Sequence, residues 1–172
     1  MKSLLVAVCL AFGFSFASGV AEARTGGPLG AGVILGDPTG LTVKYDATEI
    51  SSYDAGLAFN FDRWILVYGD YHYNFPNAFQ SQSGVLQQFV PYVGVGLVAV
   101  FSNRPELETR GFKYFDSSSS SRFALGLRIP LGIEWRPTNA PLGIFAEIVP
   151  GMTIIPATYA FAQGGLGIRY YF

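Results

Sequence analysis

The sequence contains little charge. Asp, Glu, Lys and Arg make up 13% of its 172 residues, and the formal net charge is −1. An average soluble domain has ~25% charged residues. Proteins that bind nucleic acid usually carry a basic surplus, which this chain lacks. We therefore expect no nucleic-acid partner.

Cysteine and histidine are also scarce, with one of each, Cys9 and His72. They cannot form a disulfide framework, and the carboxylates that remain for a metal do not have the Asp/Gly spacing of a calcium loop. Glycine-rich stretches such as Gly94-Val95-Gly96 lack the lysine and the helix that a phosphate-binding loop uses. We expect no cofactor and no metal.

The first 23 residues are predicted to be a secretory signal peptide. Lys2 supplies the positive end, Leu4 to Phe16 the apolar middle, and Ala21-Glu22-Ala23 the small residues before the cleavage site. Cys9 lies in this leader, so the predicted mature domain, residues 24–172, contains no cysteine. The alternative is a lipoprotein acylated at Cys9, but the valine before it is larger than the residue that such processing prefers.

The mature domain has no long hydrophobic run. Its longest, Phe89 to Phe101, is shorter than the ~20 residues of a membrane-spanning helix and contains Pro91, Gly94 and Gly96. Even so, 50% of the residues are hydrophobic and 16% are aromatic. An exported apolar chain without spanning helices leaves two classes, a soluble β-protein and a membrane β-barrel.

Residues 122–135 alternate with a period of two, as a β-strand does. The apolar face consists of Phe123, Leu125, Leu127, Ile129, Leu131, Ile133 and Trp135. The opposite face mixes Gly and Ala with two charges, which suits the crowded interior of a narrow barrel better than the outer face of a soluble sheet. Over this length a strand tilted about 45° climbs roughly 28 Å, which matches the apolar band of a bilayer. The pattern favours a membrane barrel.

The last predicted strand alternates in the same way and ends at the terminal Phe172. Such a strand resembles the signal that the outer-membrane assembly machinery reads. We expect its outward side chains to form that signal: Leu166, Ile168, Tyr170 and Phe172. The alternative is an edge strand of a soluble sheet, which would leave an apolar edge exposed.

Eight segments share this period and predict an all-β fold, a closed antiparallel transmembrane β-barrel in the bacterial outer membrane. They are Leu29–Gly36, Leu41–Ala47, Ser52–Phe61, Trp64–Tyr73, Phe89–Phe101, Arg122–Trp135, Leu142–Met152 and Thr158–Phe172. An even number of strands puts both ends on the periplasmic side. Asp37-Pro38-Thr39-Gly40 has turn chemistry. The connector 74–88 is long for a periplasmic turn, so either residues 80–88 extend a strand or the strand count is wrong.

Several short motifs, taken in order, resemble a family of small, uncharacterised bacterial outer-membrane β-barrels, classed as a domain of unknown function. They are Gly36-Asp37-Pro38-Thr39-Gly40-Leu41, Lys44-Tyr45, Asp70-Tyr71-His72, Arg128-Ile129-Pro130-Leu131-Gly132-Ile133-Glu134, Glu147-Ile148-Val149-Pro150-Gly151 and Gly164 to Phe172. The resemblance spans nearly all of the mature domain. It implies an eight-stranded barrel and carries no activity over to particular residues.

Strand parity sends a nearly balanced set of ionisable side chains into the predicted barrel: Lys44, Asp54, Asp70, His72, Arg128, Glu134, Glu147 and Arg169. They indicate either a salt-bridged, water-containing interior that blocks conduction or a selective ion path. The first is favoured because side chains about fill the bore of eight strands. Arg128 and Glu147 lie at similar heights on neighbouring strands, and we predict that they pair.

A catalytic role would depend on His72, as in lipid-modifying barrels with a Ser/His/acid set. Parity instead sends His72 inward with Asp70, and no Ser motif lies nearby. The sequence therefore favours a structural, hydrogen-bonded histidine.

The long connector 102–121 is where a partner could bind, because loops on a rigid scaffold are the usual binding surfaces. Its candidate contacts are Arg104, Arg110, Phe112, Lys113 and Tyr114. A flexible polar loop without a ligand is the alternative. We expect a monomeric barrel with a structural or surface-contact role, whose partners are outer-membrane lipid and, during biogenesis, the assembly machinery. A lipid-modifying enzyme and a narrow channel for small solutes are the alternatives.

Overall fold

The computed structural model describes residues 26–60, 64–79, 84–102, 108–109, 112–113 and 123–172. These ranges contain strands and one 3₁₀ turn, and none of their helices is long and apolar enough to cross a membrane. The elements are β1 (Leu29–Asp37), β2 (Gly40–Asp46), β3 (Ser51–Asn60), β4 (Trp64–Asn74), η1 (Leu86–Gln88), β5 (Phe89–Ser102), β6 (Glu108–Thr109), β7 (Phe112–Lys113), β8 (Phe123–Arg128), β9 (Leu131–Trp135), β10 (Leu142–Ile155) and β11 (Ala160–Tyr171).

β8 and β9 are two parts of one strand. Both lie between β5 and β10, and the register with β5 is the same on either side of Pro130: Arg128 is opposite Gly96, and Gly132 is opposite Tyr92. Proline has no amide hydrogen, so it interrupts the ladder of hydrogen bonds. Residues 123–135 of the segment predicted as one strand, Arg122 to Trp135, therefore form a single strand of the barrel.

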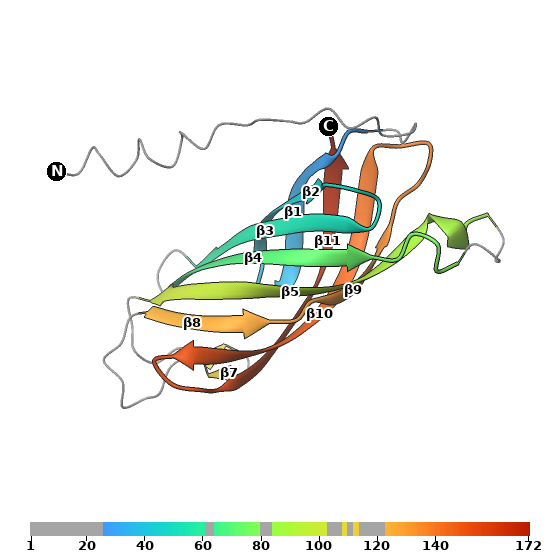
Figure 1. The fold of residues 1–172 in the computed structure, drawn as a ribbon. Coiled ribbons are helices and arrows are strands. Elements are labelled where there is room, and N and C mark those ends of the chain that lie inside the picture. Colours follow the sequence, from blue (N-terminus) through green and yellow to red (C-terminus); the bar gives the residue numbers. More distant parts are fainter. Residues whose placement is uncertain (1–25, 61–63, 80–83, 103–107, 110–111, 114–122) are drawn as a thin grey trace.

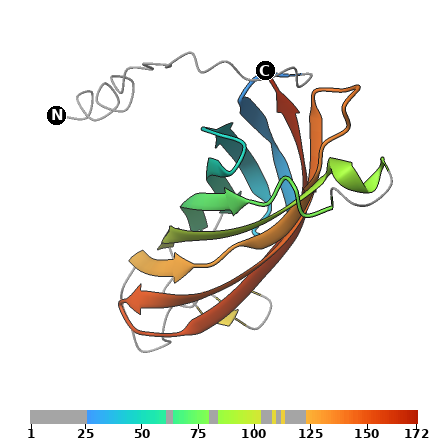
Figure 2. The same ribbon diagram turned by 45° about the vertical axis from the view of Figure 1, so that its right-hand side comes forward.

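The strands close into a barrel. Within the main sheet, which excludes β6 and β7, each strand pairs antiparallel with the next along the chain once β8 and β9 are taken as one, and β1 pairs with β11 from Gly30–Tyr171 to Asp37–Gly164. With β8 and β9 taken as one, the main sheet has eight strands and no free edge, as predicted. Figures 1 and 2 show these strands wrapped around a common axis.

The two ends of the barrel differ. At one, called the terminal end here, β1 begins, β11 ends and the connectors 47–50, 75–88 and 136–141 lie (Figure 1). At the other, called the loop end, are the turns 38–39 and 156–159. Of the questioned connector, Gly84 to Gln88 does not extend a strand and instead contains the 3₁₀ turn η1, so the connector is long and the count of eight holds.

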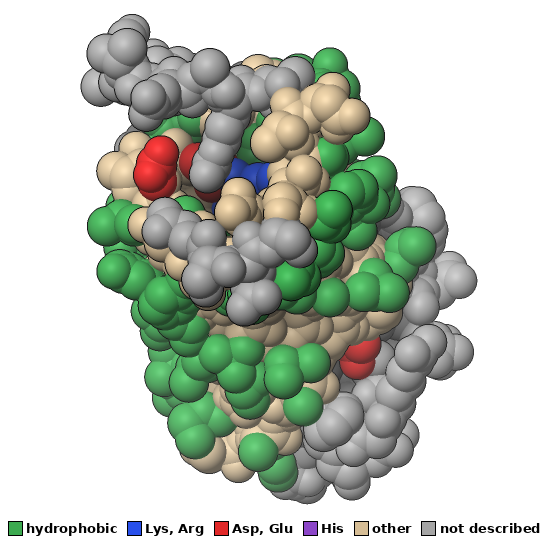
Figure 3. Space-filling model, turned by 90° about the vertical axis from the view of Figure 1, so that its right-hand side faces the viewer, with side chains coloured by type: hydrophobic (Ala, Val, Ile, Leu, Met, Phe, Trp, Pro, Cys, Tyr) green, Lys and Arg blue, Asp and Glu red, His purple; other side chains and the backbone are tan. Residues whose placement is uncertain are grey.

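The outer face of the barrel is apolar. Figure 3 shows hydrophobic side chains over much of its wall. Aromatic pairs lie at both ends: the rings of Tyr170 and Phe172 are 5.1 Å apart at the terminal end, and those of Phe101 and Phe123 are 5.2 Å apart at the loop end. This is the paired arrangement of girdles that membrane barrels show.

The interior is divided into two halves. Toward the loop end it holds an apolar plug, defined as the buried cluster Ala58, Leu66, Tyr68, Val98, Val100, Ala124 and Phe161. Toward the terminal end it holds charged side chains. Period-two alternation predicted which residues point inward, but it did not separate these two halves along the barrel axis.

Candidate functional site

The ionisable side chains that parity sends inward all lie inside the barrel, on the terminal side of the apolar plug. Each is at most 7% exposed: Lys44, Asp54, Asp70, His72, Arg128, Glu134, Glu147 and Arg169. Small residues on facing strands make the necessary room. A Cβ atom on Gly96, for example, would overlap the carboxylate of Asp70 on the adjacent strand.

Glu134, from β9, is the centre of the first group of contacts. Its Oε2 atom accepts hydrogen bonds from Lys44 Nζ at 2.8 Å and from Arg136 Nη2 at 2.6 Å. Its Oε1 atom accepts the hydroxyl of Tyr171 at 2.6 Å, and Arg169 Nη1 lies 3.8 Å away. One carboxylate thus joins β2, β9, β11 and the connector that follows β9.

Arg169 extends this group to β3. Its guanidinium forms an ion pair with Asp54 and donates to Thr42 Oγ1 at 2.9 Å. The hydroxyl of Thr42 in turn donates to Asp54 Oδ1 at 3.0 Å. The guanidinium also lies 3.7 Å from the ring centroid of Phe145, a cation–π geometry. The positive and negative partners of this group are all withdrawn from water.

Arg128 forms the second group. Its Nη2 atom is 3.6 Å from Glu147 Oε1, so the predicted pair is present, but its Nε atom lies closer to Asp70 Oδ1, at 3.2 Å. The guanidinium lies 3.9 Å from the ring centroid of Tyr68, in the apolar plug. Tyr92 completes the group by donating its hydroxyl to Glu147 Oε2 at 2.9 Å.

His72 does not make the hydrogen bond that the sequence predicted. Neither ring nitrogen has a hydrogen-bond partner among the described residues; its Nε2 is 3.9 Å from Asp70 Oδ2, and its ring stacks on Tyr92 with centroids 4.6 Å apart. Ser52 is opposite His72 on the next strand, but its hydroxyl bonds the side chain of Asn74. Packing, rather than hydrogen bonding, holds this histidine in place.

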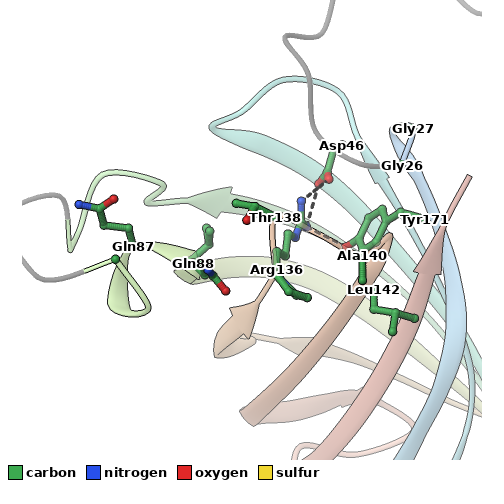
Figure 4. A pocket seen from close by; sticks show the side chains of 13 residues that line it. Gly26, Gly27, Asp46, Gln87, Gln88, Arg136, Thr138, Ala140, Leu142 and Tyr171 are labelled. Carbon is green, nitrogen blue, oxygen red and sulfur yellow. Dashed lines mark hydrogen bonds and ion pairs between the residues drawn. The ribbon is translucent and has the colours of Figure 1, made fainter.

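Arg136 and Asp46 are part of the site, although sequence analysis did not select them. Arg136 Nη1 is 2.6 Å from Asp46 Oδ2, and its Nη2 donates to the hydroxyl of Tyr171 at 2.8 Å as well as to Glu134 (Figure 4). Arg136 follows β9, beyond the alternating run, so parity does not place it; Asp46, the last residue of β2, shares the parity of Lys44 but was not selected. Burial disfavours the charge of Arg136, but the carboxylates of Glu134 and Asp46 outweigh it and raise the pKa of the guanidinium above its usual value.

A cavity of about 300 Å³ lies at the terminal end, between Arg136 and the connector before β5. Its polar lining includes Gln87, Gln88 and Thr138 (Figure 4). Gln88 fixes one wall, since its backbone carbonyl accepts the Arg136 amide at 2.9 Å and its side chain accepts Trp135 Nε1 at 3.0 Å. Figure 3 shows acidic and basic side chains gathered in this mouth.

These groups hold opposite charges close together inside the barrel. In the described ranges no group of three His, Cys, Asp or Glu side chains could hold a metal ion. The charges face one another, and no hydroxyl is bonded to His72.

The predicted assembly residues lie on the outer face of β11, from its middle to the terminal end. Leu166, Ile168, Tyr170 and Phe172 all have exposed side chains. The amide of Phe172 donates to the carbonyl of Leu29 at 2.8 Å, so the last residue still takes part in closing the barrel. Their role as a recognition signal remains a prediction.

Three of the five predicted surface-contact residues lie outside the described residues: Arg104, Arg110 and Tyr114. Phe112 and Lys113 form β7, which pairs with β6 in a short hairpin. The sequence did not predict this hairpin, because each of its strands has only two residues.

No protein-family model and no curated protein matches this chain. The crystal structure of Neisserial surface protein A has a TM-score of 0.46 and 13% sequence identity, covering 84% of this chain and 94% of that chain. A likeness of this size carries no argument about function, so the strand pairing of this chain itself establishes the eight-stranded antiparallel barrel. The resemblance to an uncharacterised barrel family stays a prediction.

Proposed function

We propose that this protein spans the bacterial outer membrane as a closed barrel, with a structural or surface-contact role and no catalytic activity. The observation that carries the proposal is the inverted distribution of polarity. The interior holds charged side chains such as Arg128 and Glu134, while large apolar side chains such as Leu35, Ile148 and Leu166 are more than 60% exposed. An apolar surface of this extent has a lower free energy in contact with lipid than in contact with water.

The height of the apolar surface supports the same proposal. Along β10, outward side chains from Ile144 to Ile154 are apolar, and all but the half-buried Ala146 are exposed. Ten steps of about 3.3 Å on a strand tilted by about 45° climb roughly 23 Å, close to the ~25 Å apolar band of outer-membrane barrels.

The apolar plug argues against the alternative of a solute channel. Leu66, Val98 and Val100 are at most 2% exposed and fill the bore on the loop side of the charged groups. An ion that entered from the terminal end would have to leave water and cross this apolar layer, at a large cost in free energy. We therefore propose a closed bore, in which the charges stabilise and orient the strands.

The alternative of a lipid-modifying enzyme has less support. Its catalytic groups would have to reach lipid, whereas His72 is 1% exposed and stacked inside the barrel. Any recognition outside the cell would then depend on the long connector, through Arg104, Arg110, Phe112, Lys113 and Tyr114.

Three measurements test this proposal. The protein in outer-membrane fractions should migrate faster on a denaturing gel before boiling than after, and recovery wholly in the soluble periplasm would refute the barrel's location. The purified protein should give no conductance steps in a planar bilayer, whereas steady steps would support a channel. Mass analysis of lipid A from a deletion strain should be unchanged, and a lost modification would support an enzyme.

A further inference from the structure

The connector between β4 and β5 differs from the other described parts of the terminal end. Residues 75–88 contain no Asp, Glu, Lys or Arg. At its end, the 3₁₀ turn η1 and the residue before it expose two aliphatic side chains, Val85 at 65% and Leu86 at 41%. These two side chains lie beyond the strands and leave a large part of their apolar surface uncovered.

The two ends of this connector lie in the aromatic girdle. Phe75 contacts Tyr73, with ring centroids 5.1 Å apart, and Phe89 stacks on Trp135, with centroids 6.4 Å apart. Such girdles mark the level where acyl chains meet lipid headgroups. Figures 1 and 2 both show η1 standing out beyond the wall of strands. The turn therefore lies outside the bore, next to the apolar band.

We propose that η1 binds the periplasmic leaflet of the outer membrane, with Val85 and Leu86 inserted at the boundary of headgroups and acyl chains. This inference rests on the proposed membrane location and adds a second contact with lipid, outside the strands. Membrane lipid is the occupant because the turn continues the apolar outer face at the girdle. The neighbouring residues, Gln87 and Gln88, are uncharged, so the turn carries no charge toward the lipid; they line the mouth cavity, whereas Val85 and Leu86 do not.

The connector 136–141, at the same end, provides a comparison. Its one charged residue, Arg136, is turned into the mouth, and its exposed residues, Thr138 and Asn139, are polar. It has no exposed large hydrophobic residue. We therefore expect Asn139 to face the periplasm while Leu86 faces lipid.

Site-directed spin labelling of the full mature protein in lipid vesicles tests this difference. The one cysteine of the chain, Cys9, lies in the predicted leader, so Leu86→Cys introduces a unique label site. Gly84→Cys gives a second site near the turn, where an added Cβ meets no atom within 4 Å. Asn139→Cys is the periplasmic control, and Ile148→Cys, on the outer face of β10, is the lipid control. Power saturation with oxygen and with nickel–EDDA then reports contact with lipid or with water.

The ratio of oxygen to nickel–EDDA accessibility should be several-fold higher at positions 86 and 148 than at position 139, with position 84 between them. A label at 86 that matches position 139 would refute insertion, provided that position 148 still reports lipid. A label at 86 shielded from both reagents would mean a protein partner or a second copy, and would overturn the assignment to lipid. If position 148 itself reports water, the proposed membrane location fails first.

Discussion

Replacing Glu134 with Gln is expected to destabilise the barrel by about 3–5 kcal/mol. The carboxylate of Glu134 accepts hydrogen bonds from Lys44, Arg136 and Tyr171, and it is buried. Gln has nearly the same shape but no charge, and its NH₂ group is a donor that would face the donor groups of Lys44 and Arg136. Lys44 would then stay buried without its anion, and Arg136 would keep only Asp46 as a carboxylate partner.

The magnitude follows from these contacts. A hydrogen bond to a charged group contributes about 1.5–3 kcal/mol of net stability. Gln keeps one oxygen acceptor, which can still serve Tyr171 on the Oε1 side, so the contacts of Lys44 and Arg136 on the Oε2 side are lost. Two such losses amount to about 3–6 kcal/mol, in line with the roughly 3–5 kcal/mol for breaking a buried ion pair.

Urea unfolding of the protein refolded into lipid vesicles, followed by tryptophan fluorescence, measures this loss. Glu49→Gln is the matched control, because Glu49 is an exposed residue in the connector after β2. A free energy of unfolding for Glu134→Gln within about 0.5 kcal/mol of that control would refute the role of Glu134. The double variant Lys44→Met/Glu134→Gln should lose less free energy of unfolding than the sum of the losses of the two single variants, because the two residues share one interaction.

Two further predictions concern the second charged group and the packing beside it. Arg128→Ala should lower the yield of folded, heat-modifiable protein, because it leaves Asp70 buried without its nearest cation; equal yields for Arg128→Ala and the loop variant Arg104→Ala would contradict this. Gly56→Ala should lower the free energy of unfolding by about 1–3 kcal/mol, because its Cβ would overlap the Tyr68 ring. Gly69→Ala, which meets open space, should not, and matching values for the two glycine variants would disprove the clash.

Much of the barrel could be predicted from period-two alternation, because that pattern is a property of the local backbone. Each strand turns successive side chains to opposite faces, so Arg128 and Glu134 had to share a face with the small residues between them. The strand count, the closed sheet and the inward direction of the charges follow from applying this rule along the chain. The prediction of a hydrogen bond at His72 was wrong, because parity fixes only the face on which a side chain lies, whereas the atoms that surround His72 depend on how the interior packs.

The connectors were predicted less well than the strands, since no periodicity constrains them. Arg136 lies 90 residues from Asp46 in the sequence and follows the alternating run of β9, so parity does not place it, whereas Asp46 shares the parity of Lys44 and could have been selected. The hairpin of β6 and β7 and the turn η1 are too short to produce a pattern.

The sequence by itself determined that the chain forms alternating strands, which of their faces is apolar, and that the charges lie within. Apart from the pair of Arg128 and Glu147, only the tertiary structure decided which charges meet, because partners such as Lys44 and Glu134 come together through the closure of the whole sheet. The division of the bore into an apolar plug and a charged half also needed the fold. Parity tells inside from outside on each strand, whereas height along the axis depends on the register between strands.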